Sequence, residues 1–536
     1  MQGKITRYKM PGLFLVLLTS MVSMAMPADA RVRPQLVVGV VIDGLDQQYL
    51  ELLRDQFGPG GFNRLMREGV VIPNADYGTN VDATAASAMI MTGAAPSTTS
   101  ITGNEVYDRD TQRTKPAMND PEAMGNFTSQ TLSPKALAVS TLADEVRIAG
   151  GGVGRVYSVS PDPSQAVILA GHSANAALWL NDRSGNWATS TFYQEMPAGV
   201  TQRNRMQPLA VRIDTMRWSP SRPASAYVGL PDHLTHYPFS HSFPRGSADR
   251  YDMFAASPKG NTEVTDVAGD LITDLRLGAQ NVTDMVNVAY TLRPYDYTSS
   301  DDNRYELIDS YLRLDRDLER LINKAESTAG KANTLIFVAA TPPSSRTRRD
   351  DEKWSIPYGE FSTKKAKSLL NMYLMAKFGN GDWVTSFHND QFYLNDKLIE
   401  SHHLDARAVR LEAAAFLEKM SGVDKVYTVD EILDGHGDPR LEALQRNTYA
   451  ATGGDLFVQV APGWETIDDI QIPARPDRVH YVKRLAAAVA PVFILAPDVD
   501  ARTIDTPVDI RVVAPTVARL LRIRSPNAAG EAPLAL

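Results

Sequence analysis

The sequence predicts an α/β fold in which a mostly parallel sheet lies between layers of helices. Several short stretches are apolar without interruption, which is typical of parallel strands that are buried on both faces. Stretches with apolar residues at helical spacing lie between them, and strands that alternate with helices form such layered sheets. A chain of 536 residues suits one large α/β domain with insertions, or two or three domains.

The first predicted strand covers residues 35–43 and ends at Asp43. Similar apolar stretches follow at 154–160, 284–291, 334–340, 455–460 and 491–496. In open α/β sheets, ligands bind beyond the carboxyl ends of the strands. We therefore expect the functional residues in the loops that follow these strands.

Two helices are predicted between the strands. One runs from Ser133 to Ala149, because serine is a good helix cap and Pro134 suits the first turn. The other carries apolar residues at helical spacing over 307–322. The segment 346–477 is more polar and includes a predicted helix over 406–420. We interpret this segment as an inserted cap region, and the alternative for its run of charges is a solvated surface.

The first 30 residues have the organisation of a secretory signal peptide. A basic start is followed by a short apolar run over 11–26, and Ala28-Asp29-Ala30 is a small-x-small cleavage signal. The alternative is a membrane anchor, but the run is short for a span. We expect cleavage after Ala30, a mature chain over 31–536 without a membrane span, and a periplasmic or secreted protein.

Composition excludes several kinds of chemistry. The chain has no cysteine, which excludes a disulfide framework, a thiolate zinc site and a cysteine nucleophile. The net charge of −8 argues against nucleic acid as a partner. Nine histidines leave few candidates for metal ligands.

Motifs along most of the chain resemble the alkaline phosphatase superfamily. They are VVIDGLDQQYL, GGFNRLMREG, TAASAMIMTG, ITGNEVYDRDT, AGHSANAALW, GDLFVQVAPGW and APTVARLLRIRSPNAAGE. The chain is most similar to bacterial alkaline phosphatases with a threonine nucleophile and to type I phosphodiesterase/nucleotide pyrophosphatases. The resemblance implies an alkaline-phosphatase-like domain over 31–536 with a cap-like insertion, and an activity that cleaves phosphate esters with two zinc ions.

Three residues match site positions of that family. Asp43 matches an aspartate that binds metal, and Asn104 matches the asparagine that holds a phosphoryl oxygen. His480 matches the last metal histidine, although a surface histidine is an equal alternative. His172 also lies in matching text, but we interpret it as a structural residue of its loop. Asp43 alone is weak support, because acids often end strands as helix caps.

Other family positions carry different residues. The nucleophile position falls on Ala83, and the neighbouring Thr84 could serve only if the register shifts by one residue. The alternative for Thr84 is a residue at a helix start. A phosphate-binding lysine and arginine correspond to Asp162 and Ser164, and an aspartate at such a place repels phosphate.

Four metal positions also differ. They correspond to Pro294, Thr298, Thr341 and Pro342. Asp296, Asp301 and Asp302 lie nearby and could substitute as ligands. Zinc is expected for the family, but two or three protein ligands do not build a tight two-zinc site.

Two functions follow from this pattern. The first is an exported, catalytically inactive binding or scaffold protein whose partner is an anionic small molecule or an envelope protein. The second is a divergent phosphomonoesterase or phosphodiesterase with Thr84 as nucleophile, Asn104 as phosphate donor and oxygen ligands for magnesium, manganese or calcium. Hydrolysis of sulfate or phosphonate esters on the same fold is a third, smaller alternative.

Overall fold

The computed structural model describes most of the chain. The described residues are Gly3, 33–78, 81–193, 196–230, 232–235, 239–298, 302–343, 359–467 and 488–536. The predicted signal peptide, except for Gly3, and His480 lie outside them. Within the described residues, no helix combines the length and the apolarity needed to cross a membrane.

An 11-stranded sheet forms the centre of the larger part of the molecule, in the order β20-β2-β19-β12-β1-β11-β6-β7-β8-β5, with β21 paired to β2. Its strands are β1 (Leu36–Asp43), β2 (Val70–Asp76), β5 (Gly125–Asn126), β6 (Val156–Ser160), β7 (Ala176–Leu180), β8 (Trp187–Ser190), β11 (Asp284–Thr291), β12 (Thr334–Ala340), β19 (Val489–Leu495), β20 (Arg502–Thr503) and β21 (Val508–Asp509). The central strands β12, β1, β11, β6 and β7 are parallel. The predicted mostly parallel sheet is thereby confirmed, while β19 runs antiparallel to both of its neighbours.

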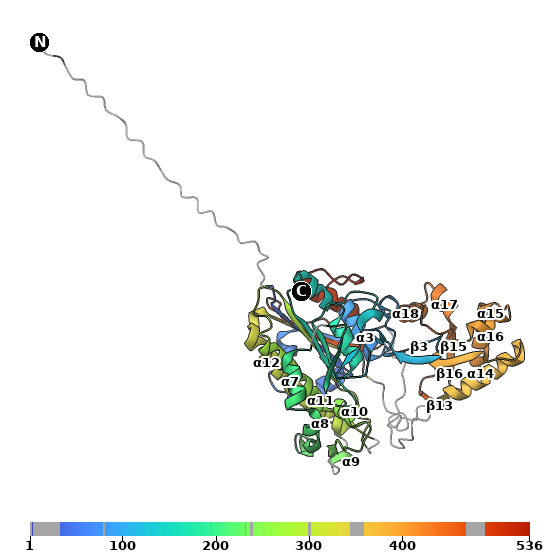
Figure 1. Cartoon of the computed structure of the whole chain (residues 1–536), viewed down its shortest axis with the longest axis horizontal. Coiled ribbons are helices and arrows are strands. Elements are labelled where there is room, and N and C mark those ends of the chain that lie inside the picture. The colour runs from blue at the N-terminus through green and yellow to red at the C-terminus, as the bar shows by residue number, and fades with distance from the viewer. Residues whose placement is uncertain are drawn as a thin grey trace.

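Helices cover both faces of this sheet (Figure 1). The helices of this larger part are α1 (Gln47–Leu52), α2 (Phe62–Glu68), α3 (Ala83–Thr92), α4 (Pro96–Thr99), α5 (Leu142–Ala149), α6 (Pro163–Ala170), α7 (Ala198–Met206), α8 (Leu209–Arg212), α9 (Asp232–Thr235), α10 (Arg250–Ala255), α11 (Pro258–Asp274), α12 (Arg304–Ala329) and α19 (Val513–Leu520). Two residues of β11 show that α11 and α6 lie on opposite faces of the sheet. Tyr290 bonds Thr265 of α11, whereas Asn287 bonds the carbonyl of Leu169 in α6. Because they are an odd number of positions apart, they point to opposite faces.

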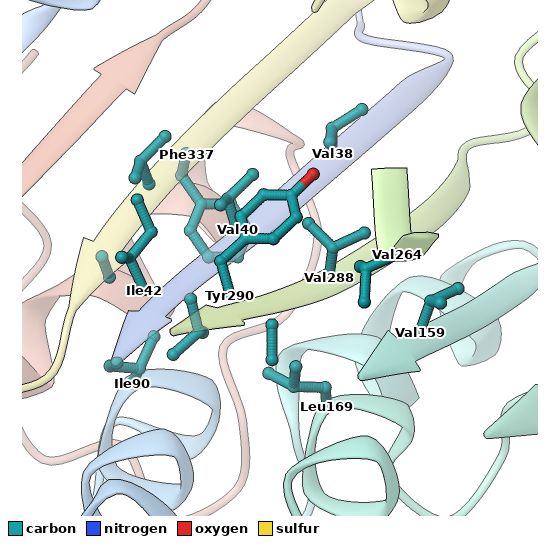
Figure 2. Packing of buried hydrophobic residues seen from close by; sticks show 14 of the residues in the cluster. Val38, Val40, Ile42, Ile90, Val159, Leu169, Val264, Val288, Tyr290 and Phe337 are labelled. Atoms are coloured by element: carbon teal, nitrogen blue, oxygen red, sulfur yellow. The ribbon is translucent and has the colours of Figure 1, made fainter. Parts of the chain in front are cut away.

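The centre of the sheet is a dense apolar core (Figure 2). All eight residues of β1 are buried, as the uninterrupted apolar run predicted. Val38, Val40 and Ile42 of β1 pack in the same cluster as Tyr290 of β11 and Phe337 of β12. This packing holds the carboxyl ends of the three strands in fixed positions relative to one another.

A second unit, drawn in orange in Figure 1, has its own apolar core, which includes Phe361, Trp383 and Leu456. It contains a four-stranded antiparallel sheet in the order β14-β15-β17-β16. Its elements are β13 (Gly359–Ser362), α14 (Thr363–Phe378), β14 (Val384–His388), β15 (Gln391–Leu394), α15 (Asp396–Ser401), α16 (Ala406–Leu417), β16 (Val423–Thr428), α17 (Val429–Asp434), α18 (Pro439–Asn447), β17 (Leu456–Val460) and β18 (Trp464–Ile467). The apolar stretch 455–460 therefore does not join the main sheet.

A hairpin from the larger part reaches the second unit (Figure 1). Its strands are β3 (Glu105–Asp108) and β4 (Arg113–Pro116). A separate short pair, β9 (Arg217–Trp218) with β10 (His241–Ser242), lies elsewhere in the chain. At the hairpin turn, Arg109 pairs with Asp396 at 3.0 Å and with Asp455 at 3.1 Å. The Arg109 guanidinium also lies over the ring of Tyr393. The hairpin thus connects the two units through charge and ring packing.

The helix predicted over 133–149 is wrong in its first part. Ser133 caps a single 3-10 turn over Pro134–Ala136, and the α-helix α5 begins only at Leu142. Thr141 and Asp144 form a reciprocal capping box there, which is a stronger helix start than serine followed by proline.

Candidate functional site

The candidate site lies at the carboxyl edge of the central strands. Asp43 ends β1 and is the register partner of Thr291, which ends β11. The backbone N–H of Leu292 donates to the carbonyl of Asp43 at 2.7 Å, and the N–H of Thr341 donates to the carbonyl of Ile42 at 2.9 Å. The residues that follow β11 and β12 are therefore held on either side of Asp43.

Both carboxylate oxygens of Asp43 have partners within the chain. Thr341 Oγ1 donates to Asp43 Oδ1 at 2.6 Å and accepts from the N–H of Gly44 at 3.2 Å. The Nε of Arg293 pairs with Asp43 Oδ2. The Asp43 side chain is 11% exposed and that of Arg293 is 49% exposed. Asp43 is thus a nearly buried carboxylate with one neutral donor and one cation.

Arg293 faces more than one acid. The Asp43 carboxylate raises the pKa of the Arg293 guanidinium, and Asp82 and Asp162 add to this effect. Burial raises the pKa of both the Asp82 and the Asp162 carboxyl. Asp162 follows β6 and caps helix α6, where its carboxylate accepts from the N–H of Gln165 at 2.8 Å. Arg293 is therefore paired with Asp43 and influenced by two further acids.

Thr84 and Asn104 lie next to each other at the start of α3. The Thr84 hydroxyl is 3.4 Å from Asn104 Oδ1. Asp82 caps the helix, accepting from the N–H of Ala85 at 2.9 Å and from the N–H of Asn104 at 2.6 Å. Thr84 is the second residue of α3 and is buried, whereas Ala83 is the first. Thr84 thus lies at a helix start, and its hydroxyl also lies beside Asn104.

His172 has the structural surroundings that the sequence suggested. Its Nδ1 lies 3.0 Å from Asp144 Oδ2 and its Nε2 lies 3.0 Å from the carbonyl of Leu137. The hydrogen bond that the imidazole donates to the Asp144 carboxylate raises the pKa of His172. Both ring nitrogens therefore have partners in neighbouring segments, Asp144 in α5 and Leu137 before it, and they tie the loop between α6 and β7 to those segments.

Two of the acids offered as substitute ligands have interactions within the described part of the chain. Asp302 pairs with Arg304, Asp301 lies outside the described residues, and Asp296 has other interactions. Ser164 is buried in the first turn of α6.

The described residues do not fit a two-metal centre. Among them, no three histidine, aspartate or glutamate side chains converge as metal ligands. The oxygens of Asp43 are already used by Thr341 and Arg293. A two-zinc site needs several anionic or imidazole ligands around each ion, and the described residues around Asp43 do not gather such a set.

Sequence reasoning missed Arg293 as a site residue. It lies two positions beyond the end of β11, beside the strand that ends at Asp43. The carboxyl ends of parallel strands meet at one edge of a sheet. A charged residue just after the strand next to β1 could therefore have indicated a side chain near Asp43.

Comparison with known proteins identifies the family. The model of the type I phosphodiesterase/nucleotide pyrophosphatase family matches residues 37–480. The alkaline phosphatase PafA of Elizabethkingia meningoseptica is 26% identical over 539 residues, covering 97% of this chain and 97% of that protein. The alkaline phosphatase PhoV of Synechococcus elongatus is 28% identical over 512 residues, covering 92% and 91%. A calcium-transporting ATPase of Myroides odoratus is 28% identical over 517 residues, covering 92% and 93%.

The fold comparison agrees with the sequence comparison. The crystal structure of alkaline phosphatase PafA superimposes with a TM-score of 0.81 at 25% identity, and the match covers 94% of this chain and 99% of that one. The family model covers most of the chain. The chain therefore belongs to the type I phosphodiesterase/nucleotide pyrophosphatase family, within the alkaline phosphatase superfamily.

Proposed function

We propose that this protein is a catalytically inactive member of its superfamily that acts as an exported binding or scaffold protein. The observation that carries the proposal is the set of contacts around Asp43. Oδ1 accepts from Thr341 and Oδ2 pairs with Arg293, so a cationic side chain stands beside this carboxylate where the family has a metal ion. Activation of a hydroxyl nucleophile and stabilisation of the leaving oxygen both require such ions in a two-metal mechanism.

The charges of the site support the same proposal. Arg293 pairs with Asp43, and Asp82 and Asp162 lie near enough to add to the raised pKa of its guanidinium. Negative charge opposes the approach of a phosphoryl group. Of the two partner classes that the sequence suggested, these charges favour an envelope protein over an anionic small molecule.

Export is proposed from the first 30 residues, whose basic, apolar and small-residue segments follow the order of a signal peptide. N-terminal sequencing of the protein recovered from the cell envelope or medium tests this directly. The expected first residue is Arg31. A mature protein that still begins at Met1 would contradict the proposal.

Elemental analysis and turnover test the loss of catalysis. The full mature chain is expected to carry no stoichiometric zinc after purification. It should hydrolyse neither an aryl phosphate nor a bis-aryl phosphate with added zinc, magnesium, manganese or calcium. Two tightly bound zinc ions, or turnover that disappears in Asp43→Ala, would refute the proposal.

The second candidate is a divergent phosphomonoesterase or phosphodiesterase. It is supported by one observation, the position of the Thr84 hydroxyl beside Asn104 at the start of a helix, where backbone N–H groups favour anions. In this case Thr84→Ala abolishes turnover, whereas Ser87→Ala, a change on the same helix whose hydroxyl bonds a backbone carbonyl, preserves it. Turnover that survives in Thr84→Ala comes from another protein in the preparation.

A further inference from the structure

We infer that Arg293 is the permanent counterion of Asp43, so that a side chain of the protein replaces a divalent cation at this position. The inference rests on the proposed loss of catalysis but concerns the stability of the fold. Asp43 is almost buried at the end of the central strand. A carboxylate in such a place is stable only when it is paired or well bonded.

A backbone hydrogen bond places Arg293 next to Asp43. Arg293 lies one residue beyond Leu292, whose N–H donates to the carbonyl of Asp43 at 2.7 Å. The guanidinium therefore reaches the carboxylate from a neighbouring point of the same sheet edge. The carboxylate of this pair is nearly buried, which distinguishes it from an ion pair that is exposed on both sides.

Gly44 has no side chain, and this makes room for Arg293. Gly44 has a φ of +80°, and a Cβ placed there would be 3.3 Å from Cγ and 3.4 Å from the backbone nitrogen of Arg293. A larger residue at position 44 would meet both this contact and the left-handed backbone. The stem of Arg293 is thus packed against the turn that follows Asp43, independently of its charge.

Thr341 completes the surroundings of Asp43 with a neutral donor. Its hydroxyl bonds Asp43 Oδ1 and the N–H of Gly44. A guanidinium keeps its proton at all accessible pH values and presents several N–H groups, so it neutralises a carboxylate without any exchangeable ligand. From these contacts the fold should need no divalent cation to keep Asp43 in place.

A double-mutant cycle on the full mature chain tests the inference. Urea unfolding is measured for the wild type, Arg293→Gln, Asp43→Asn and the double variant, in EDTA and again with zinc. We expect Arg293→Gln to lower the unfolding midpoint and Asp43→Asn to recover part of that loss in the double variant. The coupling should exceed about threefold in the unfolding equilibrium constant, and zinc should not raise the wild-type midpoint.

The control pairs Asp43→Asn with Arg183→Gln, a change at an exposed arginine in the turn after β7, and should show no coupling. Coupling below about threefold between positions 43 and 293 overturns the inference, as does a wild-type midpoint that rises with zinc. If Arg293→Gln alone does not fold, the double variant decides, because it lacks both charges and should fold. A double variant that is also unfolded overturns the inference.

This result is independent of the activity test. Strong coupling in a protein that turns over phosphate esters would refute the proposed function alone. An inactive protein without coupling would refute only the role of Arg293.

Discussion

Replacing Thr341 with valine should destabilise the protein through Asp43. Valine has nearly the same shape but no hydroxyl, and Thr341 is 1% exposed, so water does not replace the missing group. The change removes a 2.6 Å bond to a carboxylate and leaves the N–H of Gly44 without the Thr341 oxygen. A hydrogen bond to a charged group contributes about 1.5–3 kcal/mol and an orphaned buried N–H costs about 1–3 kcal/mol.

These two effects overlap, because Arg293 still neutralises Asp43. We therefore expect a loss of about 2–3 kcal/mol in the free energy of unfolding. Urea unfolding followed by circular dichroism and tryptophan fluorescence measures it. Thr341→Ser keeps the hydroxyl and should cost about 1 kcal/mol, the value of a buried methyl group.

The matched control is Thr503→Val, at an exposed threonine on the edge strand β20. Surface changes of this kind usually alter stability by at most about 0.5 kcal/mol. A loss below about 1 kcal/mol in Thr341→Val, or an equal loss in Thr341→Ser, would refute the reasoning. The carboxylate would then be held by Arg293 alone.

Two further predictions concern other parts of the molecule. Because the Asp144 carboxylate raises the pKa of His172, the stability from this pair is complete below the unfolded histidine pKa of about 6.5. It is lost as pH rises through the higher folded pKa; urea midpoints against pH should show this fall, and an unchanged fall in His172→Gln would contradict it. Arg109→Ala should cost about 2 kcal/mol, because it leaves the buried Asp455 with one fewer charged donor. Limited proteolysis should then cut between the units faster than in Arg113→Ala, an exposed change in the same hairpin, and equal rates would contradict the prediction.

Local sequence predicted the central strands because burial on both faces leaves a continuous apolar run. The strands that end at Asp43 and at Ala340 were placed correctly to within one residue. The stretch 455–460 has the same kind of run, but it pairs in the antiparallel sheet of the second unit. Apolarity indicates that a strand is buried, whereas its sheet and direction depend on partners far along the chain.

The candidate site likewise has features that local sequence predicts and contacts that depend on the fold. Motifs predicted the family, and the local apolar pattern placed Asp43 at a strand end, because both depend on residues that are near one another in the chain. Only the tertiary structure decided what Asp43 contacts. Thr341 lies 298 positions away in the chain, and Arg293 reaches the same carboxylate from another strand. Parallel strands bring distant residues to one edge, and this long-range pairing determines which charge lies beside which.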